Sequence, residues 1–216
     1  MTKAGRKSAL VLVAAATMIL AGRANAQDVS AGATPEREAI VVVHIVNYAA
    51  LSRGVLDEAR TRAAGIYDAI GVHTEWVVGE DPLLRARGGG LNLTVLLLSP
   101  DMAEKKISAE RLKDGVLGQA HPVSGRAHVF CARIATIVGD PRYFAIPLGD
   151  VIAHEVGHLL LQTNGHSPTG IMRASMDVQD THPRSFNKAQ ALAIRNSLKE
   201  REARTLARNE EVASSR

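Results

Sequence analysis

The chain has 216 residues, with 26 lysines and arginines against 22 aspartates and glutamates and a formal net charge of +4. Four of the basic residues and none of the acidic ones fall within residues 1–26, so the rest of the chain carries equal numbers of each. This balance excludes the basic footprint of a nucleic-acid-binding protein. The length beyond residue 26 suits one domain with a hydrophobic core.

Residues 1–26 have the pattern of a bacterial-type secretory signal peptide. A positively charged start precedes a mostly apolar run over residues 8–22, and Ala24 and Ala26 flank Asn25 in a small-residue cleavage site. Cleavage after Ala26 predicts a secreted or periplasmic protein without stable membrane association. An uncleaved anchor is the alternative, but the apolar run is shorter than the roughly 20 residues that span a bilayer.

The remaining pattern predicts strands and helices in alternation. Residues 27–38 are small and polar, which predicts a flexible lead-in. Continuous apolar runs predict buried strands, and apolar residues at helical spacing predict helices. The predicted strands cover 39–46, 72–78, 91–98, 118–120 and 127–134. The predicted helices cover 51–70, a short segment after Asp101, about 147–162, and a last segment from Asn187.

The last helix has a clear start and a charged end. Asn187, with Gln190 three residues later, forms a capping box, and the apolar positions that follow are Ala191, Ile194 and Leu198. From Lys199 the segment is charge-rich and is predicted to fray, so the domain is expected to cover 39–205, with 206–216 as a charged tail. This order of elements predicts an α+β fold, a mixed sheet with helices packed against it.

Cys131 is the only cysteine, so no intramolecular disulfide can form. Its apolar surroundings predict a small buried residue on a strand. The alternative is a thiol that caps a metal in a latent enzyme, which nothing in its sequence neighbourhood favours.

The segment His154-Glu155-Val156-Gly157-His158 is the strongest functional signal in the chain. On a helix, His154 and His158 lie one turn apart on one face, where both imidazoles can bind one zinc ion at about 2.0–2.1 Å. Glu155 lies beside the first histidine, where its carboxylate can take a proton from a water that zinc activates. The pattern therefore predicts a zinc site with Glu155 as general base.

Residues on either side of this motif bear on the helix and on a third ligand. Asp150, one turn before His154, either stabilises the helix start through the macrodipole or orients an imidazole as a hydrogen-bond acceptor. Asn164 and Gly165 tolerate the left-handed conformation and are predicted to end the helix. His166 follows directly and is the first candidate for the third ligand. The alternatives are Asp177, Asp180 and His182.

At these residues the chain resembles the metzincin zinc peptidases, especially the matrixin-like branch, whose motif is HExxHxxGxxH followed by a methionine turn. The positions that match are His154, Glu155, His158, His166, Ser167 and Met172. The resemblance implies a zincin-like catalytic domain, in which a twisted mixed sheet carries an active-site helix and a C-terminal helix. It also implies that Met172 lies beneath the zinc ion.

Two positions depart from the family pattern. Leu161 stands where the family has glycine, and Asn164 stands where it has the third histidine, so His166 lies two residues further on. The motif is thus a variant, HExxH-x7-H. The helix is expected to run half a turn longer before the chain reverses.

The resemblance also implies that a substrate binds as an added strand along an exposed edge of the sheet. That edge is expected around residues 125–131, and a substrate-side role is open for His121 and His128, which flank the turn. His44 and His73 are isolated and are expected to be structural residues.

These features together predict a secreted zinc-dependent endopeptidase acting on peptide or protein substrates. His154, His158 and His166 would hold Zn²⁺, and Glu155 would be the catalytic base. One alternative is a non-catalytic zinc-binding or regulatory protein on the same fold, and another is a binding module without metal. The sequence does not indicate an oligomeric state.

Overall fold

The computed structural model describes residues 41–79, 90–175 and 184–215. The predicted signal peptide and lead-in lie outside these residues, as do the alternative ligands Asp177, Asp180 and His182.

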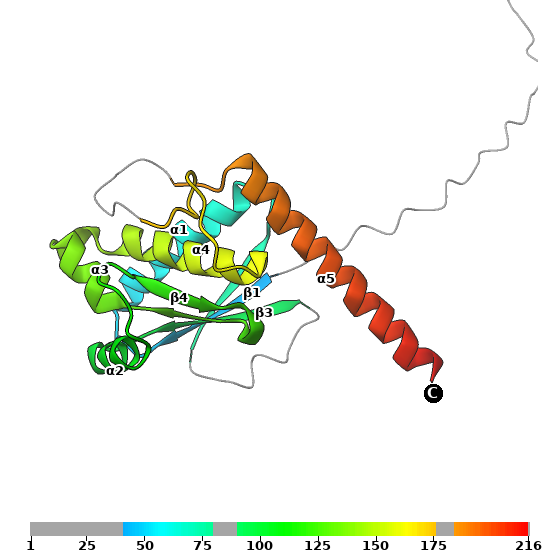
Figure 1. Cartoon of the computed structure of the whole chain (residues 1–216), viewed down its shortest axis with the longest axis horizontal. Coiled ribbons are helices and arrows are strands. Elements are labelled where there is room, and N and C mark those ends of the chain that lie inside the picture. The colour runs from blue at the N-terminus through cyan, green and yellow to red at the C-terminus, as the bar shows by residue number, and fades with distance from the viewer. Residues whose placement is uncertain (1–40, 80–89, 176–183, 216) are drawn as a thin grey trace, which may run out of the picture. The chain divides into compact units, whose positions relative to one another are not determined.

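A five-stranded sheet forms the centre of the described chain (Figure 1). Its strands are β1 Val41–Asn47, β2 Thr74–Val78, β3 Leu91–Leu97, β4 Gly118–His121 and β5 Arg126–Val129. They lie in the order β2-β1-β3-β5-β4, with β4 antiparallel to β5 and all other neighbours parallel. The predicted mixed sheet and the α+β class are confirmed.

Helices lie on both faces of this sheet: α1 and α4 on one, α2 on the other (Figure 1). The helices of the described residues are α1 Arg53–Asp68, α2 Pro100–Glu110, α3 Cys131–Val138, α4 Ala145–Leu161 and α5 Lys188–Ser214. Two short 3-10 turns cover Pro122–Ser124 and Pro141–Tyr143. The predicted helices are present, and α2 is longer than the short segment expected.

The segment 127–134, predicted as one strand, is a strand only in its first residues and a helix from Cys131. Cys131 and Ile134 are buried whereas Ala132 and Ala135 are exposed, so burial follows the helical period and not alternation. A short apolar run does not distinguish these two periods, which is why the prediction was wrong. Cys131 is buried as predicted, but on a helix.

The predicted position of the exposed sheet edge, residues 125–131, is also wrong. Strand β5 lies between β3 and β4, and β4 is the outer strand on that side. The turn at Pro122–Ser124 folds β4 back along β5, so the earlier strand of this hairpin takes the outer place. The edge next to α4 therefore belongs to residues 118–121.

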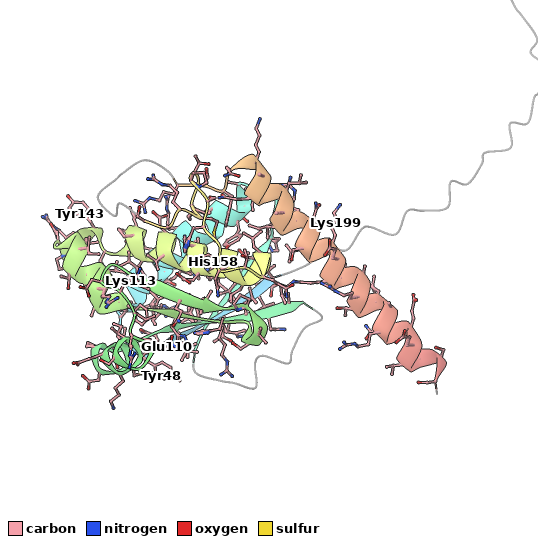
Figure 2. All side chains as sticks on the ribbon, in the orientation of Figure 1. Tyr48, Glu110, Lys113, Tyr143, His158 and Lys199 are labelled. Atoms are coloured by element: carbon pink, nitrogen blue, oxygen red, sulfur yellow. The ribbon has the colours of Figure 1, made fainter. Side chains whose placement is uncertain are left out.

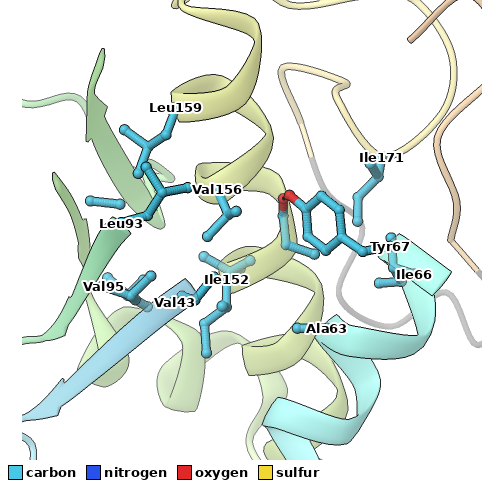
Figure 3. Close-up of a cluster of buried hydrophobic side chains, with 14 of the residues drawn as sticks. Val43, Ala63, Ile66, Tyr67, Leu93, Val95, Ile152, Val156, Leu159 and Ile171 are labelled. Atoms are coloured by element: carbon cyan, nitrogen blue, oxygen red, sulfur yellow. Dashed lines mark hydrogen bonds between the residues drawn. The ribbon is translucent and has the colours of Figure 1, made fainter. Parts of the chain in front are cut away.

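The main core lies between the sheet and the pair α1 and α4 (Figure 3). The buried side chains drawn there include Val43, Leu93 and Val95 from the sheet, Ala63, Ile66 and Tyr67 from α1, and Ile152, Val156 and Leu159 from α4. The hydroxyl of Tyr67 donates to the carbonyl of Ala153 at 2.7 Å, inside this core. Helix α4 is thus fixed on two sides along its length.

Helix α5 begins with the predicted capping box, since the side chains of Asn187 and Gln190 each bond to the other's backbone. Its buried residues end at Leu198, but the helix continues to Ser214, so the predicted fraying after Lys199 is not seen. Within the described residues, no helix combines the length and apolar character needed to cross a bilayer.

Candidate metal centre

Helix α4 carries the motif and begins at Ala145, so Asp150 lies inside it and not in its first turn. Asp150 is 3% exposed, and its carboxylate accepts a 2.7 Å hydrogen bond from Nε of Arg62 on α1. The guanidinium of Arg184 lies 3.7 Å from the same carboxylate. Asp150 therefore ties α4 to α1, and both of its predicted roles are wrong.

His154 and His158 lie on the same face of α4, as their spacing predicted. His158 projects from the C-terminal half of the helix (Figure 2). The Nε2 atoms of the two rings are 3.0 Å apart, and the residues are only 5% and 4% exposed. Two buried imidazoles thus point one nitrogen each at the same small space.

The other nitrogen of each ring bonds to a backbone carbonyl. Nδ1 of His154 is 2.7 Å from the oxygen of Ile171, and Nδ1 of His158 is 2.7 Å from the oxygen of Thr163. A carbonyl oxygen only accepts hydrogen bonds, so both Nδ1 atoms must carry the proton. Histidines that bind metals in proteins are commonly oriented by this kind of bond.

This arrangement leaves both Nε2 atoms as acceptors. Burial lowers the pKa of His154 to about 4, and it also lowers the pKa of His158, so both rings are neutral at pH 7. Two lone pairs that face each other at 3.0 Å repel unless a cation lies between them. The pair is therefore arranged as ligands for a cation and not as a hydrogen-bonded couple.

Helix α4 ends where the chain reverses at Gln162, two residues before the stop predicted at Asn164 and Gly165. Leu161 is still helical, and the next residue, Gln162, ends α4 in the left-handed conformation with a φ of 52°. The predicted helix end near residue 162 is confirmed, but the left-handed residue is Gln162 and not Asn164 or Gly165, and the extra half turn is not seen. The early reversal places the carbonyl of Thr163 against Nδ1 of His158, a bond that a longer helix would prevent.

His166 joins the pair after this reversal. Its ring centroid lies 5.3 Å from that of His154 and 4.9 Å from that of His158. One nitrogen from each of the three rings lies within 4.8 Å of the others, and His166, unlike the other two, is exposed. Within the described part of the chain, no other group of three potential ligands lies this close together.

The loop that carries His166 is anchored by the start of α5. The Gln190 side-chain amide donates to the carbonyl of Thr169 at 3.0 Å, and Asn187 donates to the Thr169 hydroxyl at 3.1 Å. The backbone N–H of Ser167 donates to the carbonyl of Met172 at 2.9 Å, which closes the loop. The capping box of α5 therefore also holds the loop that bears the third histidine.

Met172 is buried against α4, with 2% of its surface exposed. A Cβ atom added to Gly157 would lie 2.6 Å from the sulfur of Met172 and 3.2 Å from the ring of Phe186. Glycine at position 157 thus lets the methionine pack directly on the helix that carries the histidines.

Glu155 points from α4 toward the edge strand β4. It is 5% exposed, and its carboxylate accepts a hydrogen bond from the backbone N–H of Ala120. Burial raises the pKa of Glu155 to about 8, and the Ala120 bond opposes this shift only in part. A cation at the neighbouring histidines would favour the ionised carboxylate.

The other histidines lie apart from this cluster. His121 and His128 have ring centroids 5.2 Å apart. Their neighbours Ala120 and Ala127 are buried beneath α4, and successive side chains of a strand point to opposite faces, so both rings lie on the far face of the sheet. His44 bonds to Asn92 at 3.0 Å, which fits a structural residue.

Sequence reasoning missed three parts of the centre: the carbonyls of Ile171 and Thr163, and the close approach of Gly118 to Glu155. The carbonyls have no sequence signal, because every residue has one. Gly118 had only a weak signal, since it is the first residue of the predicted strand 118–120 and glycine in a strand often marks a close approach.

Comparisons with known proteins give no family. No protein-family model matches the chain, and no curated protein matches its sequence. Among solved structures, the chain is similar to the archaemetzincin of Methanopyrus kandleri, with 17% identity and a TM-score of 0.49, over 77% of this chain and 99% of that one. At this identity and TM-score, the similarity assigns no function to the chain.

Proposed function

We propose that the protein is a secreted zinc-dependent endopeptidase. The observation that carries this proposal is the cluster of His154, His158 and His166, whose ring nitrogens converge on one point, with the buried Glu155 next to the first of them on the same helix. The resemblance of the HExxH motif and Met172 to the metzincin pattern points to the same activity.

The donor set fits zinc. Three imidazoles leave one of the four tetrahedral positions open, which is the arrangement of catalytic zinc sites. Ligands at about 2.05 Å in a tetrahedron are about 3.3 Å apart. The 3.0 Å between Nε2 of His154 and Nε2 of His158 is close to this value. Small outward shifts of both rings would complete the site.

Zinc, when bound, would lower the pKa of a water molecule and polarise the scissile carbonyl. Glu155 lies next to the first ligand on the same helix, so its carboxylate would take the proton from the attacking water. The same residue would then deliver this proton to the nitrogen of the leaving amine. Its burial excludes bulk water from this exchange, which strengthens the electrostatic interactions of the carboxylate.

Strand β4 is the proposed site of substrate docking. It is the outer strand beside α4, and its residue Ala120 contacts Glu155. An extended peptide that paired with β4 would pass next to the histidine cluster. A peptide or protein is therefore the proposed substrate class.

The test uses zinc-loaded wild type, Glu155→Gln and His154→Ala with a denatured protein substrate, and cleavage is read by mass spectrometry. We expect wild type to cleave internal peptide bonds and to stop when zinc is chelated. Glu155→Gln should keep its zinc and lose cleavage, and His154→Ala should lose both. Full cleavage by Glu155→Gln would contradict the mechanism, and bound zinc with no cleavage by wild type would favour a non-catalytic zinc protein.

A further inference from the structure

Strand β4 passes unusually close to the side chain of Glu155. A Cβ atom added to Gly118 would lie 2.5 Å from Oε1 of Glu155, 2.6 Å from its Cγ and 2.7 Å from its Cδ. Real Cβ atoms do not approach other atoms this closely. Any residue other than glycine at position 118 would therefore have to push the carboxylate out of its place.

Glycine is a poor strand residue, because it loses more conformational freedom on folding and has no side chain to pack. Gly118 has no positive φ that would require glycine for backbone reasons, unlike Gly125 in the following turn, with a φ of 64°. Glycine at position 118 is therefore explained by its lack of a side chain, which leaves space beside the strand. That space is filled by Glu155.

A second contact with the carboxylate comes from the same strand, two residues after Gly118. Phe130 N–H donates to the carbonyl of Leu117 at 2.9 Å, which fixes the alternation of hydrogen-bonded pairs between β4 and β5. In this alternation the N–H of Ala120 points away from β5, and it donates to Glu155. Gly118 and Ala120 thus face Glu155 two residues apart.

We propose that Gly118 is a positioning residue for Glu155: the missing side chain at position 118 and the N–H of Ala120 together form the seat of the carboxylate. This inference rests on the proposed role of Glu155 as general base. Because β4 is also the edge strand, the strand proposed to bind the substrate holds the base as well.

The first test is a double-mutant cycle on thermal stability, which needs no activity. We expect Gly118→Ala to lower the Tm by about 3–8 °C, because the added methyl group overpacks a buried site. In a Glu155→Ala background the methyl group enters the space that the carboxylate has left, so most of this loss should disappear. Equal losses in the two backgrounds, or no loss in wild type, would overturn the proposal.

Gly79→Ala is the matched control. Gly79 follows strand β2, and an added Cβ atom there meets nothing within 4 Å. Gly79→Ala should change the Tm by the same small amount in the wild-type and the Glu155→Ala backgrounds.

The second test uses zinc-loaded Gly118→Ala and the peptide cleavage assay. A misplacement of about 1 Å lowers a rate on the order of 100-fold, so we expect kcat to fall by about that factor while KM and bound zinc stay unchanged. Unchanged kcat would overturn the positioning role. If wild type cleaves no peptide, the proposed function fails, and the stability cycle alone decides whether Gly118 forms the seat of Glu155.

Discussion

The carbonyl oxygen of Ile171 lies 2.7 Å from Nδ1 of His154, a residue 17 positions earlier in the chain. This bond fixes the ring orientation and the tautomer of a histidine on α4 from a loop that follows the helix. The same loop carries His166 and is held by the capping box of α5. Loop, helix and capping box therefore act together to bring the three histidines to one point.

His166 should be the third ligand. Loss of an orienting bond to a metal ligand costs about 10- to 100-fold in affinity, so His166→Ala should weaken zinc binding by more than about 100-fold in a chelator competition. His121→Ala, on the far face of the sheet, should bind zinc as wild type does. Wild-type affinity in His166→Ala would transfer the role to Asp177, Asp180 or His182.

Gly170→Ala should lower both stability and zinc affinity, although Gly170 is not itself a metal ligand. The φ of Gly170 is +74°, and an added Cβ atom would lie 2.5 Å from Oε1 of Gln190 and 3.0 Å from the backbone nitrogen of Asn187. We expect about 2–4 kcal/mol of lost stability in urea unfolding, from backbone strain and overpacking. Zinc affinity should fall about tenfold, because the His166 loop shifts. Loss of stability with unchanged affinity would show that the loop does not orient His166.

Arg62→Met should destabilise the protein in a pH-dependent way. The variant leaves the buried Asp150 without its closest partner, which costs about 3 kcal/mol at pH 7. Burial already raises the pKa of Asp150, and the hydrogen bond and charge of Arg62 oppose that rise, so the pKa is higher still in the variant.

A carboxyl group whose pKa is higher in the folded than in the unfolded state lowers the stability of the fold at pH values above its unfolded pKa. This loss of stability shrinks as the pH falls through the folded pKa, because the folded protein then takes up the proton. The difference in the free energy of unfolding between the variant and wild type, measured in urea, should therefore become smaller from pH 7 to pH 4. A gap that is independent of pH would contradict this account of Asp150.

Cys131 should be inert in the folded protein. It is 4% exposed, and burial raises the pKa of its thiol to about 12. The thiolate is the reactive form, so alkylation at pH 8 should be at least about 100-fold slower in the folded protein than in urea. Rapid alkylation of folded, zinc-free protein would reopen the possibility that this thiol caps the metal.

The sequence predicted the parts of the structure that local pattern controls. The capping box at Asn187 and the two histidines one turn apart depend on spacing alone, and both appear as expected. The prediction of one strand over 127–134 is wrong, because a short apolar segment fits strand and helix equally well.

The remaining parts of the centre depend on contacts between distant segments. Strand β4 lies at the edge of the sheet because of the order in which the strands pair. The pattern of buried and exposed residues along the sequence does not reveal this order. The early reversal at Gln162 places a non-glycine residue at a positive φ, where the sequence offered Asn164 and Gly165 as better candidates. At this turn the carbonyl oxygen of Thr163 lies 2.7 Å from Nδ1 of His158.

The most direct test of the central claim is X-ray absorption at the zinc edge of the zinc-loaded protein. The account predicts three imidazole nitrogens and at least one water oxygen at about 2.0–2.1 Å, and one imidazole fewer in His166→Ala. A sulfur ligand at about 2.3 Å, or four protein ligands with no water, would contradict an open three-histidine zinc site.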